Sequence, residues 1–116
     1  MEPNQIAKIA IEAMEEKKAE DIRIIDIAGI STIADYFVIA SGDNIRQVKA
    51  IANEVEEQLG KNGVVAKQIE GTQSANWILM DYSDVIIHIF DKENRIFYNL
   101  ERIWKDGKQI KKDELN

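Results

Sequence analysis

The stretch from Trp77 to Trp104 constrains the fold more than any other part of the chain. It holds two apolar runs of strand length, separated by a polar turn at 81–84, and then a segment whose apolar residues recur with helical period. Both tryptophans, two of the three phenylalanines and two of the three tyrosines lie in it. The pattern predicts a β-hairpin docked under an aromatic-rich helix, with the rest of the chain packed against this pair.

Two amphipathic helices are predicted ahead of this stretch. Residues 3–18 carry an apolar stripe at helical spacing, and Pro3 suits the first turn, where its missing N–H leaves no hydrogen bond unmade. Residues 45–59 carry a second stripe, which ends before a pair of glycines. Ser41 or Asp43 is available as the N-cap of this second helix.

Three strands are predicted around these helices, at 21–27, 36–40 and 64–69. The second is apolar throughout, which is typical of a strand buried on both faces. Because strand, helix and strand follow one another from 36 to 69, we expect a right-handed βαβ crossover with these two strands parallel. The sum is an α/β fold: a mixed sheet of about five strands with one βαβ crossover, an antiparallel C-terminal hairpin and three main helices. With 116 residues, 45% of them hydrophobic, and no flexible linker, a single domain over 1–116 is expected.

The hairpin presents two different faces. A short loop at Tyr82-Ser83 would place Trp77 opposite His88, and side chains alternate across each strand. One face is then wholly aliphatic and is expected in the core: Ile78, Met80, Val85, Ile87 and Ile89. The other mixes apolar, aromatic and acidic groups: Trp77, Leu79, Asp81, Asp84, Ile86, His88 and Phe90. This second face is either covered by a helix or offered to a partner.

Composition removes several classes of function. The chain has no cysteine, so disulfides, thiolate catalysis and thiolate metal sites are absent, and with one histidine no His-based zinc site is expected. No apolar run reaches the ~18 residues that a membrane span requires. The polar residues 1–5 do not resemble a signal peptide, so a cytoplasmic protein without membrane contact is expected.

The charge balance disfavours nucleic acid as a partner. The net charge is −6, from 21 acidic and 15 basic residues, and an acidic domain is repelled by phosphates unless it has a concentrated basic patch. The one candidate patch is interleaved with acidic residues and is interpreted as a solvated tail: Lys105, Lys108, Lys111 and Lys112. A basic protein partner suits the chain better.

Four features of the sequence are candidate sites of chemistry. Asp81 and Asp84 offer carboxylates to a divalent cation, but aspartates at a tight turn more often make local hydrogen bonds. His88 is the sole imidazole, and a lone histidine in a strand is usually a core residue. Ser41-Gly42 precedes a helix but lacks the glycines and lysine of a phosphate-binding loop. Trp77 is either buried core or a binding hot spot, and periodicity leaves both open.

Four motifs together resemble the ribosomal silencing factor (Iojap-like) family. They are A-D-Y-F-V-I-A-S-G at 34–42, W-x-L-x-D-Y-x-D-V at 77–85, H-I-F at 88–90 and R-x-F-Y-x-L-E-x-I-W at 95–104. They occur in the family's order and span nearly the whole chain. The resemblance implies a fold similar to that of nucleotidyltransferases but without their catalytic acids, and therefore a protein that is not an enzyme and needs no cofactor.

The resemblance also implies a partner. Members of the family bind the large ribosomal subunit through ribosomal protein L-fourteen, block subunit joining and repress translation when nutrients are short. By resemblance the partner-binding residues of this chain are Trp77, Leu79, Asp81 and Tyr82, with Tyr98, Glu70 and Gly71 as weaker candidates. One departure is Ser83, where members often have glycine; a turn that requires positive φ there would be mildly strained.

Other functions stay open at this point. A nucleotidyltransferase-like nucleotide-binding protein is suggested by Ser41-Gly42 with the pair Asp81 and Asp84. A ribosome assembly factor is suggested by the organellar relatives of the family. An oligomeric scaffold would use the mixed face of the hairpin, and a homodimer is compatible with ribosome binding if the two surfaces overlap.

Overall fold

The computed structural model describes residues 1–97 and 107–115, with side chains described as far as Arg95 in the first range. Its elements follow the chain in this order: α1 (Pro3–Glu16), β1 (Glu20–Asp26), β2 (Tyr36–Gly42), α2 (Ile45–Lys61), β3 (Gln68–Glu70), β4 (Trp77–Asp81), β5 (Val85–Asp91), α3 (Lys92–Phe97), β6 (Lys108–Ile110) and the 3₁₀ helix η1 (Lys112–Leu115).

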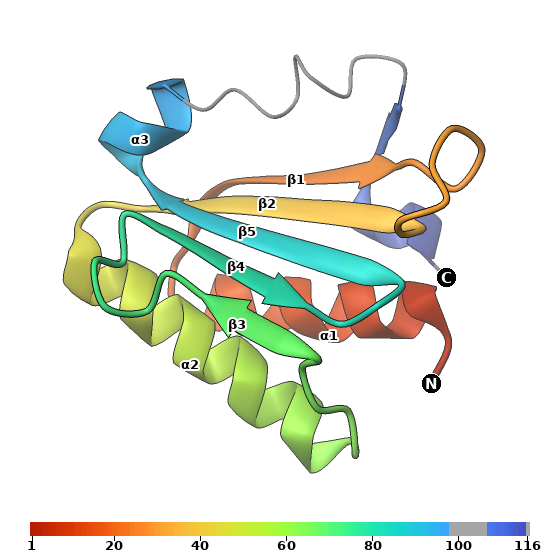
Figure 1. The fold of residues 1–116 in the computed structure, drawn as a ribbon, viewed down its shortest axis with the longest axis horizontal. Helices are drawn as coiled ribbons and strands as arrows, with labels where there is room; N and C mark the ends of the chain where they lie inside the picture. Colours follow the sequence, from red (N-terminus) through yellow and green to blue (C-terminus); the bar gives the residue numbers. More distant parts are fainter. Residues whose placement is uncertain (98–106, 116) are drawn as a thin grey trace.

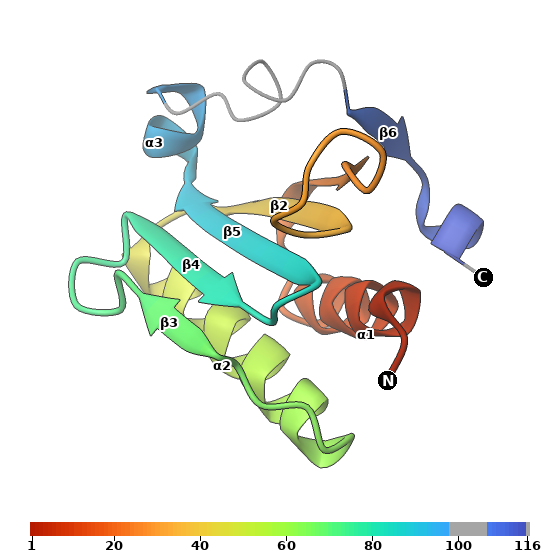
Figure 2. The same ribbon diagram turned by 45° about the vertical axis from the view of Figure 1, so that its right-hand side comes forward.

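The strands form one mixed sheet in the order β3-β4-β5-β2-β1-β6. β2 and β5 are parallel neighbours, and the other neighbouring strands are antiparallel. Helices α1 and α2 lie side by side under one face of the sheet, and α3 stands at one end of β5 on the opposite side (Figure 1). Figure 2 shows the strand order from β3 to β6 in a turned view. The mixed α/β fold with three helices is confirmed, with six strands in place of about five.

The two strands joined by the crossover, β2 and β3, are parallel as predicted, but they are not neighbours in the sheet. β3 runs in the same direction as β2, but β4 and β5 lie between them, and β3 pairs antiparallel with β4 at the edge. The parallel neighbour of β2 is β5. The physical reason is burial: both β2 and β5 are apolar runs buried on both faces, whereas Val65, just before β3, is 84% exposed.

The basic residues near the C-terminus are solvated as predicted, since Lys108 and Lys111 are exposed, but the part that the structure describes is not a free tail. Residues 108–110 form β6 and pair with the free edge of β1, which would otherwise leave backbone groups unpaired. The Lys112 Nζ lies 2.9 Å from Glu15 Oε1 on α1, and Leu115 is buried. Lys105 lies outside the described residues.

The two faces of the sheet bury different side chains. The predicted aliphatic face of the hairpin packs against α1 and α2, as expected. The opposite face carries a second apolar cluster with Trp77 and Leu79 partly buried at its border: Ile25, Ile27, Ala34, Phe37, Ile39, Ile86 and Phe90. The predicted aromatic helix begins as α3, and its continuation at 98–104 lies outside the described residues.

Neither residue predicted as the N-cap of α2 caps it. The Asn44 side chain does so, accepting a hydrogen bond from the Gln47 N–H at 2.9 Å. Ser41 is buried, and its hydroxyl accepts a hydrogen bond of 2.8 Å from the guanidinium of Arg95, which is itself only 8% exposed. Arg95 also donates to the Asp21 carbonyl at 3.0 Å, so it joins α3 to the ends of β1 and β2.

Replacing Arg95 by alanine should lower the free energy of unfolding by about 2 kcal/mol. The change removes charge-assisted hydrogen bonds and leaves the buried Ser41 hydroxyl without this donor. Urea unfolding at neutral pH measures the effect. The exposed Arg46, at the start of α2, provides the matched control. Equal stability of Arg95→Ala and Arg46→Ala would contradict the role assigned to the buried guanidinium.

Candidate functional site

The hairpin of β4 and β5 has a different register from the predicted one. Trp77 lies opposite Phe90, not opposite His88, so the predicted register is wrong by two residues. The shift arises at the turn, because the Tyr82 N–H donates to the Val85 carbonyl at 2.9 Å and the loop is Ser83-Asp84. Since side chains alternate with a period of two residues, a shift of two leaves every residue of both strands on its predicted face.

The turn itself is strained at Ser83. Its φ is 70°, and the Asp84 N–H donates to the Tyr82 carbonyl at 2.9 Å, which together describe a γ-turn of the rare positive-φ type. The Asp81 carboxylate accepts the Ser83 N–H at 2.8 Å, so it makes the local hydrogen bond expected of a turn aspartate. The strain predicted for serine at this position is therefore present.

Replacing Ser83 by glycine should stabilise the protein by up to about 1 kcal/mol. Glycine removes the cost of a side chain at positive φ, about 1–2 kcal/mol, while the greater freedom of glycine in the unfolded chain offsets part of the gain. Thermal unfolding of the two proteins measures the difference. A lower Tm for Ser83→Gly would show that the serine side chain stabilises the turn by more than its strain.

Trp77 is held by two aromatic neighbours from β5. Its ring stacks on Phe90, with centroids 5.1 Å apart and an interplanar angle of 27°. Its Nε1–H donates a hydrogen bond of 3.0 Å to Nδ1 of His88, the diagonal neighbour across the strand pair. The indole is half-buried, so one part of it is fixed in the protein while another part stays accessible.

His88 is the buried end of this arrangement. It is 4% exposed, and its ring meets Phe37 edge-on at a centroid distance of 5.1 Å. Because Nδ1 accepts the indole N–H, the neutral ring carries its proton on Nε2, which has no hydrogen-bond partner within the described residues. Burial lowers the pKa of His88 from 6.5 to about 4, so the ring is neutral at physiological pH. The interpretation of His88 as a core residue agrees with this geometry.

The structure brings some of the predicted partner-binding residues together. Trp77, Leu79 and Asp81 alternate along β4 on the side away from α1 and α2, and Glu70 of β3 lies opposite Leu79. We call these four residues the β3–β4 face. Trp77, Leu79 and Asp81 are half-buried and Glu70 is exposed, so all four present surface to solvent.

The other predicted residues are placed differently. Tyr82 is 5% exposed and packs with the core on the helix side. Burial, and secondarily the charge of Glu56, raises the pKa of Tyr82 to about 12. The Tyr82 side chain is therefore not part of the β3–β4 face. Gly71 lies in the loop that follows β3, and Tyr98 lies outside the described residues. Sequence reasoning did not find Phe90 as the support of Trp77, because the register that pairs them depends on the turn.

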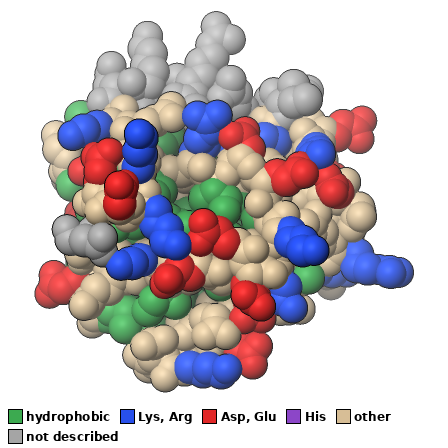
Figure 3. Space-filling model, turned by 180° about the vertical axis from the view of Figure 1, so that it is seen from behind, with side chains coloured by type: hydrophobic (Ala, Val, Ile, Leu, Met, Phe, Trp, Pro, Cys, Tyr) green, Lys and Arg blue, Asp and Glu red, His purple; other side chains and the backbone are tan. Residues whose placement is uncertain are grey.

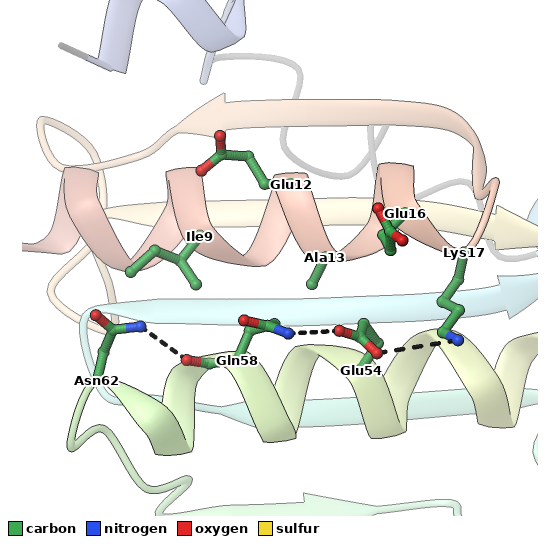
Figure 4. Close-up of a pocket in the computed structure, with 8 residues that line it drawn as sticks. All are labelled: Ile9, Glu12, Ala13, Glu16, Lys17, Glu54, Gln58 and Asn62. Atoms are coloured by element: carbon green, nitrogen blue, oxygen red, sulfur yellow. Dashed lines mark hydrogen bonds and ion pairs between the residues drawn. The ribbon is translucent and has the colours of Figure 1, made fainter.

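A groove of about 500 Å³ lies on the opposite side of the molecule, between α1 and α2 (Figure 4). Four of its polar residues contact one another. Glu54 accepts from Gln58 at 2.7 Å and lies 4.0 Å from the Lys17 ammonium, and Asn62 donates to the Gln58 carbonyl. Because these groups already have partners inside the groove, none of them indicates a ligand.

Charged side chains are mixed on the rear of the molecule. Figure 3 shows Lys and Arg interspersed with Asp and Glu there, with hydrophobic side chains between them. In the described ranges 1–97 and 107–115, no three carboxylate or imidazole side chains come together as a metal site. Over the same ranges, no helix combines the length and apolarity needed to cross a membrane.

The chain is similar to known proteins along its whole length. The family model described as "Ribosomal silencing factor during starvation" matches residues 1–116. Ribosomal silencing factor RsfS of Bacillus subtilis is 46% identical over 107 residues, which cover 92% of this chain and 91% of that protein. Protein Iojap, chloroplastic, of Zea mays is 30% identical over 98 residues, which cover 84% of this chain and 42% of the maize protein.

Solved structures show the same fold. A crystal structure of a protein from Chromobacterium violaceum has a TM-score of 0.88 and 38% identity, covering 90% of this chain and 88% of its own. A crystal structure from Bacillus halodurans has a TM-score of 0.83 and 36% identity, covering 92% and 97% respectively.

Proposed function

Because the chain belongs to the ribosomal silencing factor (RsfS) family, we propose that it binds the large ribosomal subunit, keeps the small subunit from joining and so represses translation under nutrient limitation. Ribosomal protein L-fourteen is the proposed contact, and the cytoplasm is the proposed place of action. The observation that carries the proposal is Trp77: an indole fixed by Phe90 and His88 yet half-exposed on the β3–β4 face.

This arrangement has the properties of a binding hot spot. Large aromatic side chains that are held rigid lose little conformational freedom when a partner covers them. Leu79 extends the apolar surface of Trp77 along β4, while Asp81 and Glu70 add carboxylates at its border. A centre of apolar groups with a charged rim is the usual anatomy of a protein interface.

The charge of the chain favours a basic protein as the partner. With a net charge of −6, the protein is attracted to a basic ribosomal protein and repelled by exposed RNA phosphates. Such complementarity raises the association rate and selects the partner. Blocking subunit joining then requires only a standard interface of roughly 1,600 Å² and a body that collides with the incoming subunit.

The proposed mechanism involves no reaction and no cofactor. Two of the residues that suggested nucleotide chemistry have structural partners: Ser41 accepts from Arg95, and Asp81 accepts from the backbone of the turn. The first turn of α2 is capped by Asn44. None of these contacts favours nucleotide binding as a second function.

Sucrose-gradient sedimentation of purified subunits tests the proposal. The protein is expected to sediment with the large subunit, not with the small one, and to reduce the fraction of joined ribosomes when it is added in excess. Undiminished joining at saturating protein would overturn it. Association with immature large subunits alone would assign the protein to ribosome assembly.

A further inference from the structure

The loop that joins β3 to β4 is held by one backbone hydrogen bond within the loop and by another to the end of β5. It runs from Gly71 to Asn76, and the Ala75 N–H donates to the Gly71 carbonyl at 2.9 Å. The Asp91 N–H, at the end of β5, donates to the Asn76 carbonyl at 3.2 Å. Both ends of the closure have positive φ, 86° at Gly71 and 57° at the fully buried Ala75. The loop therefore has a defined shape where it leads into Trp77.

Gly71 lies against the backbone of Trp77. A Cβ atom added to Gly71 would stand 2.1 Å from the Trp77 carbonyl oxygen and 3.2 Å from its carbonyl carbon. Both are backbone atoms of a paired strand, so they cannot relieve the contact by a rotamer change, as the end of a flexible side chain could. Any residue larger than glycine at this position therefore forces a backbone shift, either of the loop at Gly71 or of the start of β4.

The indole of Trp77 is sensitive to such a displacement. Its contact with Phe90 and its 3.0 Å hydrogen bond to His88 both depend on where the Trp77 backbone stands relative to β5. We infer that Gly71 is a positioning residue: it allows the close approach that sets the Trp77 indole in the β3–β4 face, and it does not itself contact the partner. This inference rests on the proposed function for its consequence in binding, and on the fold alone for its effect on the indole.

Gly71→Ala and Gly63→Ala form a matched pair for the test. Gly63, in the turn after α2, has a φ of 77°, but an added Cβ there meets nothing within 4 Å. Both changes therefore place alanine at positive φ, and only one of them pushes on Trp77. The first measurement is the indole ¹⁵N–¹H signal of Trp77 in the full chain, assigned with a Trp104→Phe variant. In Gly71→Ala we expect this proton to move upfield, toward a free indole, and in Gly63→Ala to stay unchanged.

Binding to purified large subunits is the second measurement. Gly71→Ala should bind about 10-fold more weakly or worse, and Gly63→Ala as the wild type does. A folded Gly71→Ala protein with the wild-type indole signal and wild-type binding overturns the inference. If the wild type does not bind the subunit, the proposed function fails, while the indole signals still decide whether Gly71 positions Trp77.

A third variant keeps the test decisive if Gly71→Ala does not fold. Thr72 and Gln73 are two exposed residues of the same loop, and replacing both by alanine leaves the Gly71 approach intact. If the loop only positions Trp77, the double variant binds within about 2-fold of wild type. A loss of 10-fold or more would show that the loop contacts the partner directly, and it would overturn the positioning role.

Discussion

Replacing Trp77 by alanine is expected to weaken binding to the large ribosomal subunit by about 2–4 kcal/mol, or roughly 30- to 1,000-fold in Kd. The indole is the largest side chain of the β3–β4 face, and it is rigid before binding because it stacks on Phe90 and donates to His88. A partner that covers it gains apolar contact without ordering a mobile group. Sedimentation or pelleting with purified large subunits measures the change.

The same substitution also affects the fold. Replacing a fully buried aromatic residue by alanine lowers the free energy of unfolding by about 3–5 kcal/mol. Because Trp77 is only half-buried, a loss of about 2 kcal/mol is expected for Trp77→Ala. Binding must therefore be measured on protein shown to be folded. Val65→Ala is the control for a surface truncation away from the β3–β4 face, since Val65 is 84% exposed in the segment before β3.

Trp77→Phe separates the stack from the hydrogen bond. Phenylalanine keeps a ring over Phe90 but has no N–H for Nδ1 of His88, which is left as a buried acceptor at a cost of about 1–3 kcal/mol in stability. Binding is expected to fall between the wild type and Trp77→Ala. If a folded Trp77→Ala protein bound with wild-type affinity, the binding surface would have to lie elsewhere than on β4.

Which residues belong to the hairpin faces could be predicted because alternation is a local property of a strand. Ile78, Met80 and Ile87 face the core on the helix side, and Trp77 faces the other side of the sheet. A register shift by an even number of residues does not change these faces. The register itself could not be predicted, because it depends on a γ-turn at Ser83 whose strain only the surrounding fold maintains.

The order of strands was harder to predict because it depends on contacts far apart in sequence. The pattern of strand, helix and strand predicted that β2 and β3 are parallel, but it did not indicate that β4 and β5, from a later part of the chain, lie between them. The uninterrupted apolar run of β5 is the signal that favours a central place, and the lysine and glutamine at 67–68 favour an edge. Likewise, Arg95 is part of a family motif, but its buried pairing with Ser41 involves residues 54 positions apart.

Acidification from pH 7 to pH 4 should remove up to about 3 kcal/mol of stability through His88 alone. The pKa of this imidazole is about 4 in the folded protein, against an ordinary value of 6.5. Between these two values the unfolded chain binds a proton that the native protein does not, so stability rises with pH in this window. The slope reaches at most about 1.4 kcal/mol per pH unit, and the contribution is complete above about pH 7.

The hydrogen bond between Trp77 and His88 also predicts that stability falls on acidification. A protonated imidazole has no lone pair at Nδ1, so it cannot accept the Trp77 N–H, and a charge would then stand in a cluster of aromatic rings. Urea unfolding at several pH values, for the wild type and for His88→Phe, isolates the contribution of His88, because all other titratable groups are common to both proteins. His88→Phe should be less stable at pH 7 and should lose less stability on acidification. Parallel stability curves for the two proteins would mean that His88 accepts a proton in the folded state as readily as in the unfolded chain, and that the Trp77 indole does not depend on a neutral ring beside it.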